Sequence, residues 1–249
     1  MKPLKAPARG YWADLAYIHD VGHSDYAGKA APGLLRILRR CGVKEGLIVD
    51  LGCGSGRRAR ELNRAGYRVL GIDQSPSMIR LARQNAPASK FQVASFLTVE
   101  LPPCDAITSI GECLNYRFDK RNNRTALARM FARAYRALRP GGVFIFDVAT
   151  LARFSPKLPQ KSCRQGRDWA VLVSSALERS TKTFSRRIIA FRRVGKEYRR
   201  SEEIHSLQLY RARDLVNDLA QCGFDARTLR GYGGVHLPAG MSGVLAVKP

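Results

Sequence analysis

Short apolar runs alternate with amphipathic segments through the first 150 residues of the chain. The apolar runs have the length and β-branched content of buried strands, and the amphipathic segments have the period of helices. Strands are expected at residues 47–51, 67–72, 90–94, 105–110 and 143–147. Helices are expected at residues 13–19, 34–41, 57–65, 76–85 and 124–138. This alternation predicts a parallel sheet with helices on both faces.

Local signals support two of these boundaries. Ser75 is a suitable cap for the helix that begins at Pro76, because a serine oxygen can accept from the free backbone amides of a first turn. The Pro-Gly-Gly run at residues 140–142 is expected to end the preceding helix before the fifth strand.

The pattern changes after residue 150. Long strand-like segments are expected at residues 169–175, 182–194 and 198–210. Gly195-Lys196 marks a tight turn between the last two, which predicts an inserted antiparallel element. A helix at residues 214–222 and strands at 224–230 and 244–247 then complete the pattern.

Net charge is the one unusual feature of the composition. The formal charge is +23 at pH 7, and residues 151–213 hold 16 basic against 5 acidic side chains. Such a surface favours polyanions or acidic partners. Many of the arginines nevertheless recur on the solvent face of predicted helices, which favours a solvated surface over nucleic-acid binding.

The six cysteines are scattered, without a CxxC pair or a histidine at ligand spacing. Neither a metal site nor a disulfide framework is therefore expected, and reduced thiols in a cytoplasmic protein are the simpler interpretation. No apolar stretch approaches the length of a membrane span or of a signal-peptide core.

A glycine-rich turn follows the first strand. Asp50 precedes it, and Gly52, Gly54 and Gly56 allow a tight backbone that a ligand can approach. A dinucleotide-binding loop would place its third glycine at position 57, where Arg57 stands. The spacing therefore disfavours a pyrophosphate cradle.

This acidic residue followed by GxGxG closely resembles motif I of the class I, Rossmann-like S-adenosylmethionine-dependent methyltransferases. The resemblance continues in order through Asp73 after the second strand, Ser75 to Met78, Ser95-Phe96 after the third strand, and Leu138 to Gly142. It covers roughly residues 45–150, and the ordered set is specific.

The resemblance implies an α/β fold: a doubly wound, mostly parallel seven-stranded sheet of order 3-2-1-4-5-7-6 with an inserted antiparallel β element. We expect one methyltransferase domain over residues 1–249. Its parts are N-terminal helices forming a lid at 1–44, the cofactor-binding core at 45–150, a substrate-covering insert at 151–210 and the return of the core fold at 211–249.

S-adenosyl-L-methionine is the cofactor that the resemblance implies. Asp73 takes the place of the family's ribose-binding acid, because a carboxylate at a strand end can accept from both ribose hydroxyls. Met78 and Phe96 would flank the adenine or else pack in the core, and Asp50 is expected to position the glycine loop. The full set of expected cofactor residues is Tyr17, Asp50, Gly52, Cys53, Gly54, Gly56, Asp73, Gln74, Met78, Ser95, Phe96 and Gly111.

The acceptor side is expected at the carboxyl ends of the strands. Glu112 and Tyr116, in the loop after the fourth strand, are candidate catalytic residues, with Asn115 as a further candidate to orient the acceptor. His205 shares a strand face with Glu203 and could act as a base, or else be structural. In the N-terminal stretch, Tyr17, His19 and Tyr26 are candidate lid residues.

A small molecule that accepts a methyl group on oxygen or nitrogen by in-line displacement is the favoured substrate. An RNA methyltransferase that uses the basic surface is an alternative, although the Asn/Asp-Pro-Pro-aromatic motif of many base methyltransferases is absent. The third hypothesis is a nicotinamide-dependent oxidoreductase or a non-catalytic nucleotide-binding protein. Arg57 disfavours the oxidoreductase.

Overall fold

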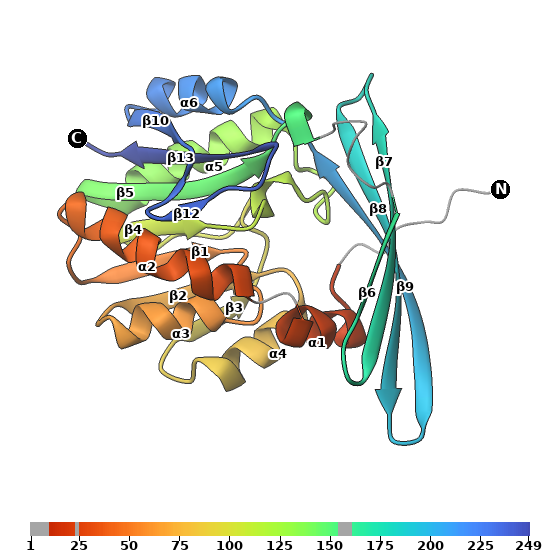
Figure 1. Cartoon of the computed structure of the whole chain (residues 1–249). Helices are drawn as coiled ribbons and strands as arrows, with labels where there is room; N and C mark the ends of the chain where they lie inside the picture. The colour runs from red at the N-terminus through yellow and green to blue at the C-terminus, as the bar shows by residue number, and fades with distance from the viewer. Residues whose placement is uncertain (1–9, 23–24, 154–160) are drawn as a thin grey trace.

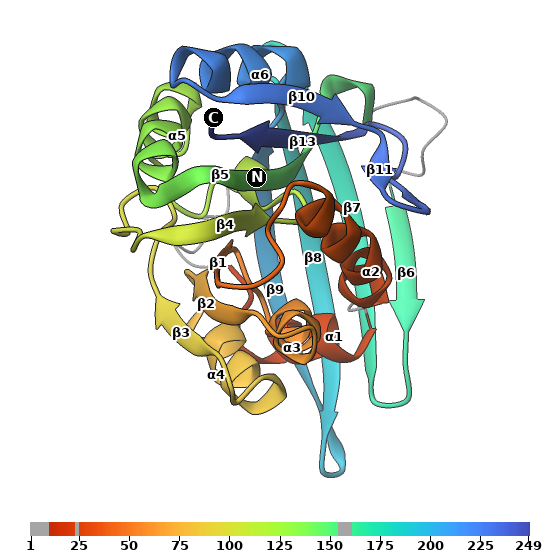
Figure 2. The ribbon, with the colours of Figure 1, turned by 90° about the vertical axis from the view of Figure 1, so that its left-hand side faces the viewer.

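A seven-stranded sheet forms the centre of the computed structural model, which describes residues 10–22, 25–153 and 161–249, with the backbone alone at residues 25–29 and 153. Its strands are β1 (Leu47–Leu51), β2 (Arg68–Asp73), β3 (Lys90–Val93), β4 (Cys104–Ser109), β5 (Leu138–Ala149), β10 (Asp225–Leu229) and β13 (Met241–Val247). They lie in the order β10-β13-β5-β4-β1-β2-β3 (Figure 2), and only β13 runs antiparallel to its neighbours. This arrangement confirms the predicted fold class and strand order.

Both faces of this sheet are buried by helices, which explains the continuous apolar character of the inner strands. Ile48 of β1 faces one core cluster, whereas Val49 and Leu51 face the other. The helices are α2 (Asp25–Arg40) and α3 (Arg57–Arg64) on the first face, α5 (Arg124–Ala137) and α6 (Ala212–Gln221) on the second, and α4 (Pro76–Asn85) beside β2 and β3. Among the described helices none is long and apolar enough to cross a bilayer.

A second, antiparallel sheet stands beside the first (Figure 1). Its strands, in spatial order, are β6 (Lys161–Gln165), β7 (Trp169–Glu178), β8 (Thr183–Val194) and β9 (Glu197–Gln208). Helix α1 (Ala13–Gly22) lies between the two sheets, where Leu15 and Ile18 pack on Trp169 and Ile188. The N-terminal segment is thereby placed between the core fold and the insert.

Several elements differ from the expectations. Strand β6 was not expected, because all five of its residues are exposed and no apolar alternation marks it; its pairing with β7 defines it. Strand β5 already begins at Leu138, ahead of the Pro-Gly-Gly run, because that residue pairs with β4. Helix α2 begins at Asp25, ahead of the expected start at residue 34, and contains Pro32. The remaining short elements are η1 (Cys113–Asn115), η2 (Leu151–Arg153), β11 (Gly231–Tyr232) and β12 (Val235–His236).

Candidate active site

The glycine loop lies at the carboxyl end of β1, where β1 and β2 run side by side. Gly52 donates a backbone hydrogen bond of 2.7 Å to the carbonyl of Ile72. Gly52, Gly54 and Gly56 all adopt left-handed backbone conformations, with φ of 71°, 54° and 75°. A β-carbon added at Gly54 would meet no heavy atom within 4 Å, so this part of the backbone borders open space. The loop is shaped for close approach of a ligand.

Asp73 ends β2 beside this loop. Its Oδ2 accepts from the Gly54 amide at 2.9 Å, and its Oδ1 accepts from the Ser75 amide at 2.9 Å. Burial raises the pKa of the Asp73 carboxyl to about 6, although these amide hydrogen bonds act against the shift. Each carboxylate oxygen keeps a second lone pair, so two further donors, such as vicinal hydroxyls, can be accommodated.

Asp50 supports the loop from behind. Its Oδ1 accepts from the Arg58 guanidinium at 2.7 Å and from the Thr108 hydroxyl at 2.7 Å, and all three side chains are buried. Arg58 also donates to the carbonyl of Ile110 at 3.5 Å. Asp50 therefore joins β1 to α3 and β4, as expected for a residue that positions the loop indirectly.

A cavity follows the carboxyl ends of β1, β2 and β4. Eight of the twelve predicted cofactor residues line it: Gly52, Cys53, Gly54, Asp73, Gln74, Met78, Phe96 and Gly111. The empty space of the cavity is about 1080 Å³, which includes space that is open to solvent. Asp50 and Gly56 lie behind the loop and do not line it.

Two further predicted cofactor residues lie outside the cavity. Ser95 turns its hydroxyl to Asp119 Oδ2, at 2.7 Å, and accepts from the Leu97 amide. Tyr17 donates to Asp168 Oδ2 at 2.8 Å, and the Arg192 guanidinium lies 3.7 Å from the centroid of its ring. Tyr17 thus joins α1 to the insert.

The N-terminal segment reaches the cavity through other residues. Gly10, Tyr11 and His19 line it, whereas the side chain of Tyr26 lies outside the described residues. Ser75 donates its hydroxyl to the carbonyl of Tyr11 at 2.7 Å. Tyr11 has a left-handed φ of 57°, which is uncommon for a residue with a side chain and is held here by contacts on both sides.

The loop after β4 is held by a buried acid of β5. Asp147 Oδ1 accepts from the amides of Gly111 and Glu112 at 2.8 and 2.5 Å, and Oδ2 accepts from the Tyr232 hydroxyl at 3.0 Å. Glu112 forms an ion pair of 2.6 Å with Arg186 of β8 and does not line the cavity. The predicted catalytic carboxylate is thus held by a cation of the insert.

Tyr116 brings this loop to the cavity wall. Its hydroxyl shares a hydrogen bond of 3.3 Å with the Tyr11 hydroxyl and accepts from Arg186 at 3.2 Å. Burial raises the pKa of Tyr116 to about 12, against the influence of Arg186, so the phenol stays protonated at neutral pH. Asn115, beside it, is buried and bonded to the backbone of Ala149 and Gln208.

His205 lies behind the aromatic wall of the cavity. Its ring centroid is 4.9 Å from those of Tyr11 and Phe118 and 5.8 Å from that of Tyr116. Its Nε2 donates to Glu203 Oε2 at 2.8 Å, and the side chain is 1% exposed. The predicted shared strand face of Glu203 and His205 is confirmed, but the ring does not line the cavity.

Comparison with known families identifies the core. The model of a family described as a methyltransferase domain matches residues 48–142, which span the glycine loop, Asp73 and the loop after β4. Residues 48–142 form a methyltransferase domain. The fold of the whole chain is similar to that of solved S-adenosylmethionine-dependent methyltransferases. This confirms the cofactor that the resemblance to motif I implied.

Relatives and solved structures agree with the methyltransferase assignment. A putative methyltransferase of Bacillus subtilis is 26% identical over 73% of this chain and 74% of its own length. A sugar N-methyltransferase of Streptoalloteichus has a similar fold, with a TM-score of 0.78 at 20% identity over 100% of this chain and 97% of the other. An S-adenosylmethionine-bound amino pentose methyltransferase of Micromonospora gives 0.76 at 16% identity over 96% and 99%.

Some residues of this methyltransferase site were missed by reasoning from the sequence. Tyr11 and Phe118 line the cavity, and Arg186 and Asp147 hold the loop that carries Glu112. Asp147, an acid at the end of the expected fifth strand, could have been predicted as a site residue from the sequence. Nothing in the local sequence singles out Arg186 among the many arginines of the insert.

Proposed function

We propose that this chain transfers a methyl group from S-adenosylmethionine to an oxygen or nitrogen of a small molecule. The observation that carries the proposal is a single cavity with two chemically different parts. The glycine loop and Asp73 line one part, and the rings of Tyr11, Tyr116 and Phe118 line the other. The first part fits a nucleoside, and the second fits a compact acceptor.

The residues of the first part suit the cofactor. The open space beside Gly54 leaves room for the methionine portion, and Asp73 has lone pairs for the ribose hydroxyls. Met78, Ala94 and Phe96 line an apolar stretch that suits the adenine. When bound, S-adenosylmethionine supplies a methyl group that is already activated on a sulfonium sulfur.

The protein's own part in such a transfer is alignment and exclusion of water. Tyr116 has a protonated hydroxyl fixed by Arg186 and Tyr11, so it can orient a lone pair of the acceptor toward the methyl group. Glu112 neutralises Arg186, which leaves the wall without net charge from this pair. Such a wall favours a neutral acceptor over an anionic one.

The insert supports a small acceptor as well. Strand β9 contributes Glu203 and His205 behind the aromatic wall, and β8 contributes Arg186. The fold similarity to the two sugar methyltransferases spans nearly the whole chain, so it includes this insert. We propose that residues 151–210 act as the substrate cover and residues 1–44 as a lid.

Calorimetric titration with S-adenosylmethionine, S-adenosylhomocysteine and NADH is the first test. Micromolar binding of the first two, without NADH, is the expected result. A panel of amino sugars, hydroxylated aromatics and small amines is then incubated with S-adenosylmethionine, and each product is examined by mass spectrometry for one added methyl group. Binding of NADH alone would overturn the proposal.

A further inference from the structure

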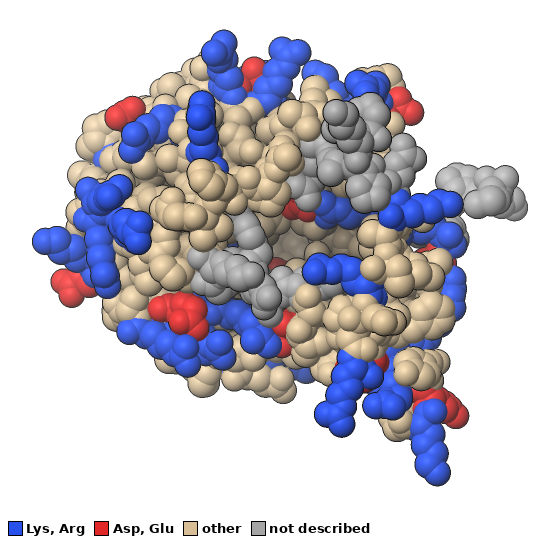
Figure 3. Space-filling view, viewed as in Figure 1, with Lys and Arg blue, Asp and Glu red and all other residues tan. Residues whose placement is uncertain are grey.

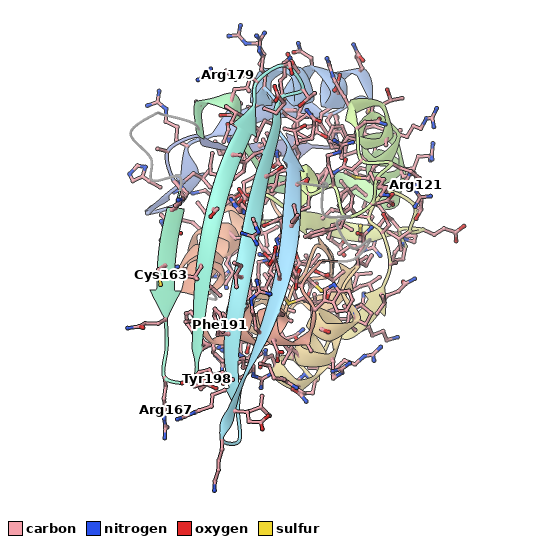
Figure 4. The ribbon with its side chains drawn as sticks, turned by 90° about the vertical axis from the view of Figure 1, so that its right-hand side faces the viewer. Arg121, Cys163, Arg167, Arg179, Phe191 and Tyr198 are labelled. Carbon is pink, nitrogen blue, oxygen red and sulfur yellow. The ribbon has the colours of Figure 1, made fainter. Side chains whose placement is uncertain are left out.

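The insert has a second face that the methyltransferase site does not use. Alternate residues of β7, β8 and β9 point away from α1, because their neighbours in sequence pack against that helix or the cavity wall. In Figure 4 no helix or strand of the described residues lies over this face. The outer face comprises Cys163, Ala170, Leu172, Arg187, Ile189, Phe191, Arg193, Tyr198, Arg200 and Glu202.

Aromatic and arginine side chains alternate on this face. Phe191 is paired in register with Arg200, and Arg193 is paired with Tyr198. Directly opposed residues of antiparallel strands have β-carbons about 5 Å apart, so each ring has a guanidinium beside it. Tyr198 is 59% exposed, and both rings are labelled on the sheet in Figure 4.

Apolar side chains extend the surface away from these pairs. Leu172 of β7 is paired with Ile189 of β8, and Ala170 is paired with Phe191. Leu172 is 44% exposed, although large apolar side chains are usually buried. The outer face is therefore partly apolar.

The charge of the outer face is positive. Glu202 is the acidic residue among these side chains, and it is already paired with Arg187 at 2.7 Å and with Arg200 at 2.7 Å. By the same alternation, Glu178 faces outward at the other end of β7. Arg193 is exposed and adds a further positive charge. Basic side chains are spread over the side seen in Figure 3, and several lie at the projecting end of the β8–β9 hairpin, with acidic ones among them.

We propose that this outer face binds single-stranded nucleic acid. Tyr198 is exposed and Phe191 is partly exposed. Outward-facing rings on an antiparallel sheet can stack with unpaired bases, and the arginines beside them can contact the phosphates between those bases. Charge complementarity favours a polyanion, since the chain carries a net +23. The site is distinct from the cavity, because none of the outer-face residues lines the cavity, and Arg186 and His205, which lie behind the cavity wall, are on the inner face of the sheet.

The charge and the aromatic side chains of the outer face favour single-stranded nucleic acid over a second copy of the chain and over an acidic protein. A second copy of the chain would bring the same positive charge to the interface, which opposes association. An acidic protein would satisfy the arginines but would not require flat rings at positions 191 and 198. Replacing a ring by an aliphatic side chain therefore distinguishes base stacking from apolar docking.

The test is fluorescence anisotropy of the full chain with a labelled 12-nucleotide oligouridylate, titrated at several salt concentrations. We expect Tyr198→Leu and Phe191→Leu each to weaken binding about tenfold, while Tyr198→Phe binds as the native chain does. Arg193→Glu should also reduce the slope of log affinity against log salt concentration, by an amount that corresponds to at least one lost phosphate contact. Arg129→Glu, an exposed change of equal charge on α5, serves as the matched control.

Three results would overturn the proposal. One is equal affinity of the native chain and Tyr198→Leu for the oligonucleotide. Another is binding of polyglutamate as tightly as oligouridylate at equal charge. The third is a stable dimer of the native chain, detected by light scattering, that the Tyr198→Leu substitution dissociates. Each variant is first checked for native binding of S-adenosylmethionine, so a failed fold is recognised independently.

Discussion

Glu203 of the insert accepts hydrogen bonds from the backbone amides of Tyr11 and Trp12, at 2.7 and 2.8 Å. These amides come just before α1, where backbone donors have no partner within the helix. The carbonyl of Tyr11 accepts from Ser75, two residues after Asp73. The N-terminal segment is therefore held between the cofactor-binding core and the insert, with the Tyr11 ring on the cavity.

Removing the charge of Glu203 should loosen this segment. Glu203→Gln keeps one oxygen acceptor but loses a charge-assisted hydrogen bond, which is worth about 1–2 kcal/mol. We expect roughly tenfold faster hydrogen exchange at the Trp12 amide and faster release of S-adenosylmethionine. Glu202→Gln, on the opposite face of the same strand, is the control. Unchanged exchange at Trp12 would show that Glu203 does not hold the segment.

Asp73 should make cofactor binding depend on pH. Its pKa is raised to about 6 by burial, and only the carboxylate form can accept from both ribose hydroxyls. Affinity for S-adenosylmethionine should therefore be highest above pH 7 and fall as the pH drops through about 6. Titration calorimetry between pH 5 and pH 8 measures this change.

The Asp73→Asn variant isolates the same contact. An asparagine can still accept from the Gly54 amide, but it has no charge and does not titrate. We expect it to bind S-adenosylmethionine roughly 2 kcal/mol more weakly at pH 8 and to lose most of the pH dependence. Native affinity in this variant would refute the ribose role of Asp73.

The sequence was sufficient where chemistry is local. The glycine loop, Asp73 and Met78 occupy one contiguous stretch, and the alternation of apolar runs determined the strands around them. The acceptor side is built from contacts between distant segments, such as Arg186 with Glu112 and Tyr11 with Tyr116. No periodicity encodes which of many arginines or tyrosines will meet across such a distance.

Burial also separated residues that the sequence treats alike. His205 and Tyr116 were both reasonable candidates for proton transfer. In the fold, Tyr116 lines the cavity, while Glu203 and three rings enclose His205. The alternation along β9 predicted the shared face of Glu203 and His205, but it could not reveal which side chains would lie in front of that face.

The Asp50–Arg58 pair should matter chiefly for stability. Both side chains are buried, and removing one partner of a buried pair leaves an uncompensated charge. We expect Asp50→Ala to lower the free energy of unfolding by about 3–5 kcal/mol, measured by urea denaturation without cofactor. Glu61→Ala, which breaks the solvent-accessible pairs with Arg60 and Arg64, should cost less than about 1 kcal/mol. Similar costs for the two variants would contradict the structural role of Asp50.

Tyr116 and His205 should differ in their effect on turnover. Tyr116→Phe removes the hydroxyl that Arg186 fixes at the cavity wall, so we expect kcat to fall about tenfold while affinity for S-adenosylmethionine is kept. His205→Gln keeps a donor for Glu203 behind that wall, so kcat should stay within about threefold of the native value. Both variants are measured over a pH series with an acceptor identified by the mass-spectrometric screen.

A general base contributes about a hundredfold or more to kcat and gives the profile of kcat against pH an ionisation limb. Loss of that limb and of turnover in His205→Gln would therefore make His205 the base and require a rearrangement of the aromatic wall during the reaction.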